Sequence, residues 1–342
     1  MVYDWTSKNN IGGYIVELFD NLKFKIVRRN IKIVFPEATD SRILGAAARL
    51  KAEELMEPIL IGSPDKIVEA AHARGIKTSN FTIIDPDNYD KWDEMVEAFV
   101  ERRKGKVSKE DAVKILKDVN YFGTMLTYMG YADGMVSGAI HSTGDTVRPA
   151  LQIIKTKPGV SRTSGAMIMV RGRDQEKYIF ADCAINVNPT AQELAEIAVD
   201  SAKTAELFDI DPKIAMMSFS TKGSAKAPEV DKVVEATKIA QQLAPEYEID
   251  GELQFDASYV ASVAQLKAPN SNVAGKATVF VFPELQSGNI GYKIAQRLGN
   301  FEAIGPILQG LNKPVSDLSR GANEEDIYKL SIITAAQTLM DK

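Results

Sequence analysis

Cysteine and histidine are nearly absent from this sequence of 342 residues. The single cysteine, Cys183, excludes an internal disulfide framework and any metal site built from several cysteines. With only two histidines, His72 and His141, the sequence argues against histidine-rich zinc chemistry. We therefore expect a chain that folds without internal disulfides and holds no metal through several cysteines or histidines.

Long apolar runs are missing too, because no stretch approaches the roughly 18 residues that a membrane span needs. Residues 11–29 are amphipathic and basic, but they lack the apolar core and the cleavage site of a signal peptide. We expect a packed N-terminal helix there, with a helix at a membrane interface as the alternative. The sequence thus gives no reason to expect a segment that spans a membrane.

Several nucleotide and hydrolase motifs are absent. No two glycines are separated by a single residue, so the dinucleotide motif G-x-G-x-x-G does not occur. Gly305 and Gly310 have the spacing of a phosphate-binding loop, but Leu311 follows where that loop needs lysine. Neither H-E-x-x-H nor G-x-S-x-G is found. These absences argue against nucleotide hydrolysis, hydride transfer of the Rossmann type and serine-hydrolase chemistry.

The composition is that of an ordinary globular protein, with 45% hydrophobic and 25% charged residues. A length of 342 residues favours two domains. The formal net charge of -5 gives no reason to expect nucleic-acid binding, although a local basic groove for an anionic ligand is compatible with it.

Short apolar runs alternate with helical patterns through the first half of the chain, and this alternation predicts a parallel sheet with helices on both faces. A charged turn between two later apolar runs, residues 166–170 and 178–185, predicts an antiparallel hairpin. The other expected strands are residues 31–35, 58–61, 81–84, 134–138, 214–219, 253–255 and 278–282, and the expected helices are residues 40–56, 64–75, 88–130 with a basic break at 102–106, 191–208, 229–243, a helix through 297, and 324–340.

These elements predict an α/β fold with two α/β domains. The first domain takes residues 1–160 together with 310–342, because the C-terminal helix is expected to return to it. Residues 161–309 form the second. No repeat and no linker marks the boundary.

The polar turn before the last helix concentrates chemical groups. It offers a hydroxyl (Ser319), a guanidinium (Arg320) and a carboxylate in the first helical turn (Asp326). These groups suit a thiol, a phosphate and a proton. Asn323 is a natural N-cap, and Asp326 falls at the third helical position as in a capping box. A well-capped helix with a solvated arginine is therefore the structural alternative.

Two further polar loops follow apolar strands, where open α/β sheets bind ligands. The first, residues 137–149, contains Ser142 and Thr143 among small residues and ends near Arg148. Small residues let backbone N–H groups approach an anion, and an arginine adds a fork of donors. The second, residues 218–225, is dense in hydroxyls. It contains Ser220, Thr221 and Lys222. Together the loops favour an anion site over ordinary turns.

The sequence resembles the phosphate acetyltransferase (phosphotransacetylase) family over nearly its whole length from about residue 30. The matching stretches are residues 32–37, 133–139, 141–143, 145–153, 180–184, 218–224, 288–298 and 317–321. The resemblance implies the reversible reaction acetyl-CoA + phosphate ⇌ CoA + acetyl phosphate. It also implies two α/β domains around a deep cleft, similar to the isocitrate and isopropylmalate dehydrogenases, and a cytoplasmic homodimer without metal or prosthetic group.

The resemblance also implies roles for single residues. Asp326 takes the proton of the CoA thiol, Ser319 hydrogen-bonds near the sulfur, and Arg320 binds phosphate and stabilises the developing oxyanion. Arg102, Arg148 and Arg297 match further functional arginines. CoA attacks directly in a ternary complex, so we expect Cys183 to be a buried cysteine beside the cleft and no covalent nucleophile. Ser316, Gly144 and Ala322 depart from the family pattern, but none of them removes a proposed chemical group.

Three alternatives remain open at this point. One is acyl transfer to phosphate with a longer chain such as butyryl. Another is a noncatalytic domain that senses acetyl-CoA, against which the joint presence of Ser319, Arg320 and Asp326 argues. The third is a metal-dependent dehydrogenase of the same architecture.

Overall fold

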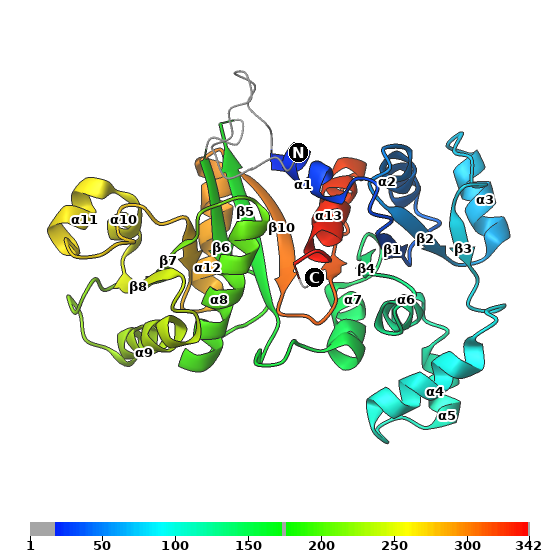
Figure 1. Cartoon of the computed structure of the whole chain (residues 1–342), viewed down its shortest axis with the longest axis horizontal. Helices are drawn as coiled ribbons and strands as arrows, with labels where there is room; N and C mark the ends of the chain where they lie inside the picture. The colour runs from blue at the N-terminus through cyan, green and yellow to red at the C-terminus, as the bar shows by residue number, and fades with distance from the viewer. Residues whose placement is uncertain (1–17, 173–175, 341–342) are drawn as a thin grey trace, which may run out of the picture.

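The computed structural model describes residues 18–172 and 176–340. Its first sheet is parallel and has the strand order β11-β4-β1-β2-β3. Figure 1 shows this sheet on the right, with helices around it. The sheet is built from β1 (Lys32–Phe35), β2 (Glu57–Ile61), β3 (Thr82–Ile84), β4 (Gly134–Ser137) and β11 (Val315–Asp317), and the helices that accompany it are α2 (Ser41–Ala52), α3 (Pro64–His72), α4 (Trp92–Arg103), α5 (Lys109–Ile115), α6 (Val119–Tyr128), α7 (Thr143–Pro149), the π-helix η1 (Ala150–Ile154) and α13 (Glu324–Gln337).

Helices cover both faces of the first sheet, as the sequence predicts. In β1, Ile33 and Phe35 join a buried cluster with residues of α2 and α13, whereas Val34 joins the cluster formed with α4 and α6. This division follows from the alternation of side chains along a strand. Because β4 pairs parallel with β1 on one edge and with β11 on the other, the carboxyl ends of β1, β4 and β11 lie next to one another.

The second sheet is mixed, with the order β10-β5-β6-β9-β7-β8. The predicted hairpin is confirmed, because β5 and β6 pair antiparallel. Helices α8 and α9 pack on one face. Helices α10, α11 and α12 lie on the other face, near a buried cluster that includes Phe180, Phe280 and Phe282. The elements are β5 (Ser164–Arg171), β6 (Glu176–Ala181), β7 (Lys213–Met217), β8 (Glu248–Leu253), β9 (Val279–Val281), β10 (Glu302–Gln309), α8 (Ala191–Leu207), α9 (Pro228–Leu243), α10 (Phe255–Tyr259), α11 (Ala261–Lys267) and α12 (Leu285–Leu298).

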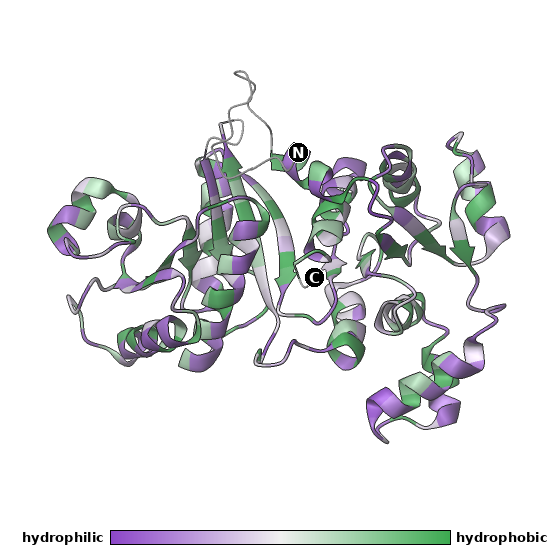
Figure 2. Ribbon diagram, in the orientation of Figure 1, coloured by the Kyte–Doolittle hydropathy of each residue, from purple (hydrophilic) through white to green (hydrophobic). Residues whose placement is uncertain are grey.

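Helices α13 and α1 (Leu18–Ile26) lie between the two sheets (Figure 1). A single buried apolar cluster extends from β1 through α13 and β5 to α8. Figure 2 shows hydrophobic residues concentrated in the strands and on one side of many helices. Polar contacts add to this junction, since Lys25 Nζ donates to the Leu207 carbonyl at 2.9 Å and Gln337 Nε2 to the Leu308 carbonyl at 3.0 Å. The C-terminal helix therefore contacts both sheets.

Some local predictions were wrong. The expected strand at 253–255 is displaced, because β8 ends at Leu253 and Phe255 already begins α10. The expected polar loop after β4 gives way to α7 at Thr143. The 88–130 region is helical with a break after Arg103, as predicted, and it contains three helices. Helix α13 ends at Gln337, before the predicted end at residue 340. Short elements such as α10 and β11 carry too little periodicity to be recognised from sequence. The predicted N-terminal helix is present from Leu18, and residues 11–17 lie outside the described residues. Among those described, no helix is long and apolar enough to cross a membrane.

Candidate active site

Three segments meet where β1, β4 and β11 end. The chain leaves β11 beside β4, where the Leu318 N–H donates to the Ser137 carbonyl at 2.7 Å. The next residues along the chain are Ser319 and Arg320, both exposed. The carboxyl edge of a parallel sheet is the usual ligand site of α/β proteins. The turn that the sequence singled out therefore lies at the edge where a ligand is expected.

Glu37, which follows β1, fills the loop after β4. The residue is only 2% exposed. Its carboxylate accepts the backbone N–H groups of Ala139 (2.7 Å), Ile140 (2.9 Å) and His141 (2.9 Å), and it also contacts His141 Nδ1 at 2.7 Å. We expected these N–H groups to approach a ligand anion. In the folded chain an internal carboxylate uses them, and the polar side chains that follow remain at the surface.

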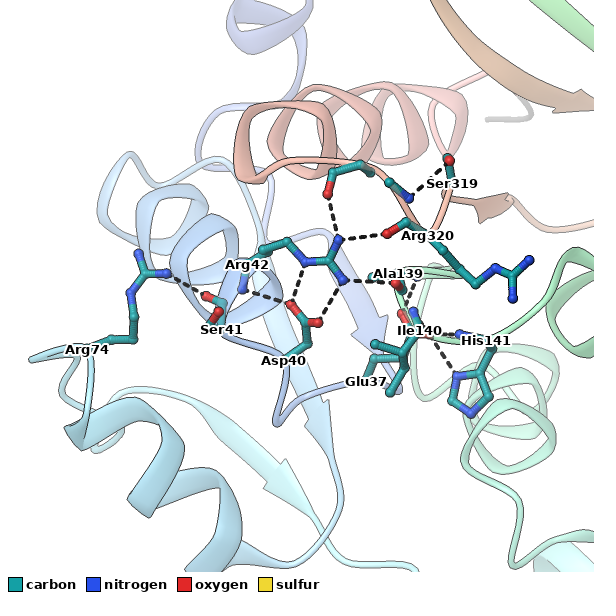
Figure 3. Close-up of polar contacts among 12 residues, drawn as sticks. Glu37, Asp40, Ser41, Arg42, Arg74, Ala139, Ile140, His141, Ser319 and Arg320 are labelled. Atoms are coloured by element: carbon teal, nitrogen blue, oxygen red, sulfur yellow. Dashed lines mark hydrogen bonds and ion pairs between the residues drawn. The ribbon is translucent and has the colours of Figure 1, made fainter.

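Arg42 joins the three segments (Figure 3). Its guanidinium donates to the carbonyls of Arg320 (3.0 Å), Ala322 (2.7 Å) and Ala139 (2.9 Å). The hydrogen bond from Arg42 to Asp40 raises the pKa of Arg42 above its ordinary value. Although burial opposes the shift, hydrogen bonds from Arg42 lower the pKa of Asp40. A charged clamp therefore fixes the Ser319–Ala322 turn against the β4 loop.

The turn itself is internally bonded. The Ser319 hydroxyl accepts the Gly321 N–H at 3.2 Å, so its own proton is not used in that contact. The predicted capping box at α13 is confirmed. Asp326 N–H donates to Asn323 Oδ1, and Asp326 Oδ2 accepts the Asn323 N–H, both at 2.9 Å. Asp326 is exposed in the first turn of α13.

Asp317 lies just beneath this turn and is 4% exposed. Burial raises the pKa of Asp317, while a hydrogen bond with the Thr143 hydroxyl acts in the opposite direction. Thr143 begins α7, so the contact joins the end of β11 to that helix. One predicted site residue, Thr143, thus contacts the buried carboxyl group that precedes the Ser319 turn.

Two other predicted residues are the N-cap of α7, Ser142, and Arg148 within the helix. The Ser142 hydroxyl donates to Asp145 Oδ2 at 2.7 Å, and this bond lowers the pKa of Asp145. Arg148 is exposed farther along α7. Because α7 packs against β11, the structure brings Ser142, Thr143 and Arg148 to the same region as Ser319.

A basic cluster lies at the other end of the α7–η1 segment. Arg102 Nε and Nη2 donate to the carbonyls of Ile153 (2.6 Å) and Ile154 (3.0 Å), where η1 ends. Burial lowers the pKa of Lys155, and four neighbouring cations lower it further. We call these side chains the basic cluster, and its members are Arg102, Arg103, Lys104, Lys106 and Lys155. The cluster has the charge to bind a phosphate-rich ligand, although Arg102 also has structural contacts.

The remaining predicted residues lie in the loop after β7 and in α12, next to the second sheet. The Ser220 hydroxyl and the Gly223 N–H both donate to Glu252 at 2.8 Å. The Thr221 hydroxyl donates to Gln254 Oε1 at 3.1 Å. Lys222 pairs with Asp250, and Arg297 is exposed in the last turn of α12. The contacts described above do not join these residues to Ser319, and the donors of the Ser220 loop serve internal acceptors.

Cys183 is 1% exposed, in the loop after β6. Burial raises the pKa of its thiol, and the adjacent Asp182 raises it further. Asp182 accepts the N–H groups of Ala184 (2.8 Å), Ile185 (3.0 Å) and Asn186 (2.8 Å), which fixes this loop. Ile185 packs against the buried cluster that α4 and α6 form with the first sheet, so the loop reaches that cluster from the second sheet. A buried thiol with a raised pKa is poorly suited to nucleophilic attack.

Sequence reasoning assigned no role to Glu37, Arg42 or Asp317. The only available signal was position, since Glu37 and Asp317 each follow or end an apolar strand inside a stretch that carries the family resemblance. Their partners lie on distant segments, so local patterns do not identify them. Among the residues that the structure describes, no group of three or more His, Cys, Asp or Glu side chains is placed to hold a metal ion.

Comparison with known proteins gives consistent results. A family model described as "Phosphate acetyl/butaryl transferase" matches residues 17–335. The chain is 59% identical over 325 residues to a phosphate acetyltransferase of Bacillus subtilis, covering 95% of this chain and 100% of the relative. A crystal structure of a phosphotransacetylase from Streptococcus pyogenes superposes with a TM-score of 0.93 at 66% identity, covering 94% of this chain and 98% of the other. A phosphotransacetylase from Staphylococcus aureus gives a TM-score of 0.90 at 58% identity, with the same coverage.

Proposed function

The chain belongs to the phosphate acetyltransferase family, and we propose that it transfers an acetyl group reversibly between coenzyme A and inorganic phosphate within a ternary complex. The structural observation that carries the proposal is the Arg42 clamp, which holds Ser319 and Arg320 at the carboxyl edge of the parallel sheet. We propose acetyl transfer and not butyryl transfer because the similar proteins described above are named phosphate acetyltransferase or phosphotransacetylase.

The chemistry assigns a role to each group of the turn. The thiolate of CoA, and not the thiol, attacks the acetyl carbon, so a base is needed. Asp326 is proposed as that base, with the Ser319 hydroxyl donating to the sulfur. Negative charge then develops on the carbonyl oxygen, where the preformed Arg320 cation stabilises the transition state.

The capping box does not prevent Asp326 from acting as a base. A carboxylate has two oxygens with about four acceptor sites. Asp326 Oδ2 accepts the Asn323 N–H, and the remaining acceptor capacity of the side chain is available to a substrate proton. The cap then serves catalysis by holding the carboxylate in a fixed orientation.

The phosphates of CoA are proposed to bind at the basic cluster. The α7–η1 segment from Thr143 to Ile154 separates this cluster from the His141 end of the site. Its 12 residues correspond to a length of about 18 Å at helical rise. The long pantetheine arm of CoA can bridge a separation of that size. Arg148, exposed on α7 between the two ends, is proposed to contact the substrate along this path.

The second sheet supplies the opposite wall in this proposal. We assign residues 1–160 with 310–342 to one domain and 161–309 to the other, with acetyl transfer in a deep cleft between them. The Cys183 loop forms part of that wall, and Arg297 is retained as a candidate contact for CoA. Ser220, Thr221 and Lys222 are weaker candidates because their internal partners have to be displaced before they can bind a ligand.

CoA is a substrate here, and the proposed chemistry calls for no metal or prosthetic group. We also propose that the protein acts as a homodimer in the cytoplasm. Helix α12 supports a dimer, because Ile290, Ile294 and Leu298 are 56%, 53% and 80% exposed at four-residue spacing on one face. Ile294 also lines an apolar cavity of about 490 Å³ together with Phe255 and Tyr259 of α10. A second copy of the chain would cover this surface.

The function is tested by phosphate-dependent release of CoA thiol from acetyl-, propionyl- and butyryl-CoA, measured with a chelator present. We expect activity that requires phosphate, is highest with acetyl-CoA and is insensitive to the chelator. A preference for butyryl-CoA would support the longer-chain alternative. Binding of acetyl-CoA without phosphate-dependent turnover would support the sensing domain.

The Arg320 side chain provides a direct test of the site. Arg320→Ala should lose about 2 to 4 kcal/mol of transition-state stabilisation, which is the scale of one lost oxyanion donor. Arg320→Lys should restore little, because an ammonium lacks the planar fork. Arg28→Ala is the matched control, since Arg28 forms an exposed ion pair with Glu54 on the surface. A folded Arg320→Ala enzyme with normal turnover would remove this residue from the mechanism.

A further inference from the structure

Glu37 and His141 form a hydrogen-bonded pair at the edge of the proposed site. Glu37 Oε1 lies 2.7 Å from His141 Nδ1. The same oxygen accepts the backbone N–H groups of Ile140 and His141, each at 2.9 Å. An ionised carboxylate can only accept hydrogen bonds, so Nδ1 carries the proton in this contact. The pair therefore fixes the tautomer, and in the neutral ring Nε2 holds the lone pair.

The orientation of the ring follows from burial. The Glu37 side chain is 0% exposed, whereas that of His141 is 27% exposed. Because Nδ1 contacts the buried carboxylate, Nε2 is the ring nitrogen that Glu37 does not engage, and the side chain as a whole is partly exposed. Figure 3 shows the His141 ring and the Arg320 guanidinium on the same side of the Arg42 clamp. Arg42 ties both segments together through the Ala139 and Arg320 carbonyls.

The proposed reaction requires a proton at the phosphate. When the C–O bond of acetyl phosphate breaks, the electron pair passes to the phosphate oxygen. Unprotonated phosphate is a trianion and a poor leaving group, so an acid that supplies a proton assists the step. In the proposed scheme Asp326 takes up the proton of the thiol. It therefore has no role left as the acid that protonates the departing phosphate oxygen. The phosphate side of the reaction thus calls for a second proton-exchanging group.

We propose that His141, oriented by Glu37, contacts the phosphoryl group through Nε2 and exchanges the proton that the phosphate oxygen needs, an inference that rests on the proposed acetyl transfer. Toward acetyl-CoA, the thiol proton passes to Asp326, the sulfur–carbon bond forms and the carbon–oxygen bond breaks. The departing oxygen takes the Nε2 proton of the imidazolium. Solvent then carries the proton of Asp326 back to His141, so thiol and acetyl phosphate give acetyl-CoA and monohydrogen phosphate in balance. In the opposite direction, neutral Nε2 removes the proton of the attacking phosphate.

The charges around His141 are compatible with this role. Glu37 contacts Nδ1, and Arg42 and Asp317 act on Glu37 from the neighbouring segments. Asp145 of α7 lies within electrostatic reach of His141 and is itself influenced by Arg148. His141 thus has one carboxylate in contact and another within electrostatic reach, while Arg148 and Arg320 are proposed to supply positive charge for the phosphate.

Two substitutions separate proton exchange from a purely structural contact. In His141→Asn the amide nitrogen replaces Nδ1 and can keep the bond to Glu37, but nothing replaces Nε2. In His141→Gln the amide lies near the Nε2 position and can hydrogen-bond phosphate, but it cannot exchange a proton. His72→Gln, on α3, is the control.

We expect His141→Gln to lower kcat by about 100-fold or more with a much smaller change in the KM for phosphate. His141→Asn should lower kcat and also raise the KM for phosphate, with little change in the KM for CoA. Normal kinetics in His141→Asn would overturn the proposal, since the Glu37 contact alone would then suffice. Normal kcat in His141→Gln would overturn it as well, because hydrogen bonding without proton exchange would then suffice.

A second measurement needs no substitution at His141. The chain has only two histidines, so nitrogen NMR of the labelled imidazoles gives two sets of ring signals, which His72→Gln assigns. Titration of the full chain with inorganic phosphate should move the Nε2 signal of His141 saturably and leave His72 unchanged. Absence of any His141 response at saturating phosphate would overturn the contact. Failure of the proposed function can be told apart from failure of the His141 proposal. In the first case the unaltered protein itself would lack phosphate-dependent turnover.

Discussion

Three acidic residues near the proposed site have different environments despite their similar chemistry. Glu37 is buried and satisfied by backbone N–H groups, Asp317 is buried with a raised pKa, and Asp326 is exposed in a helix cap. A carboxylate that accepts several N–H groups orients the backbone around it. A buried carboxyl group without such support is costly in its ionised form. The environment of each carboxyl group therefore gives Glu37 a structural role, makes the ionisation of Asp317 costly and leaves Asp326 accessible to a substrate.

Arg42 is expected to act through the position of the turn. Arg42→Ala removes hydrogen bonds to three carbonyls on two segments. A displacement of about 1 Å at a reacting group can cost on the order of 100-fold in rate. We expect a fall of that order in kcat, and poor rescue by Arg42→Lys, because lysine lacks the planar fork. Turnover and circular dichroism are the measurements, and a folded Arg42→Ala protein with unchanged kcat would contradict the positioning role.

Asp317 gives the protein a pH-dependent stability. Since burial raises the pKa of Asp317 in the folded state, the folded protein binds more protons than the unfolded chain between the ordinary value of 3.8 and the raised value. Stability therefore falls as pH rises through this window. Asp317→Asn removes that contribution, so its gain in Tm over the unaltered protein should be larger at neutral pH than near pH 4.

Thermal melts across this pH range test the prediction, with the exposed Asp90→Asn as control. A difference in Tm that is constant with pH would show that the effect of Asp317→Asn does not come from ionisation.

At the scale of elements, the N-terminus of α13 combines a cap with the proposed base. The cap needs acceptors, which Asn323 and Asp326 both supply. The base needs a proton acceptor that can become neutral, which asparagine cannot replace. The cap role therefore predicts a loss of stability on substitution of Asn323, and the base role predicts a loss of turnover on substitution of Asp326.

Asn323→Ala should cost about 1 kcal/mol of stability, because it removes the N-cap. Asp326→Asn keeps an oxygen acceptor, so it should cost less stability but lower kcat by about 10²- to 10⁴-fold. Thermal melts and turnover measured on both variants separate the roles. If a folded Asp326→Asn enzyme turns over normally, Asp326 is a cap and another group removes the thiol proton.

For the whole molecule, the proposed dimer can be tested on α12. Ile294→Lys places a charge in the exposed apolar face, so we expect a shift from dimer to monomer in sedimentation velocity. Val68→Lys on α3 is the matched control, because Val68 is also an exposed apolar helical residue at 46%. A monomeric unaltered protein, or a dimer that Ile294→Lys leaves intact, would exclude this face as the interface.

Local patterns in the sequence were sufficient for much of the architecture. The buried run of β1, the α/β alternation and the charged turn between β5 and β6 depend on neighbouring residues, so periodicity predicted them. The Asn323 cap was predictable for the same reason, since its partners lie within three residues. The resemblance to the phosphate acetyltransferase family likewise rests on contiguous stretches of sequence.

Tertiary structure decided which of these polar groups are available to a ligand. Arg42 reaches the Arg320 carbonyl across 278 residues, and Glu37 reaches the Ala139 N–H across 102. No local pattern encodes such pairs, because they form only after β1, β4 and β11 align in one sheet. The sequence by itself determined which reactive side chains the chain carries. Packing determined that Glu37 fills the β4 loop beside a partly exposed His141, because a buried carboxylate needs donors from wherever the fold brings them.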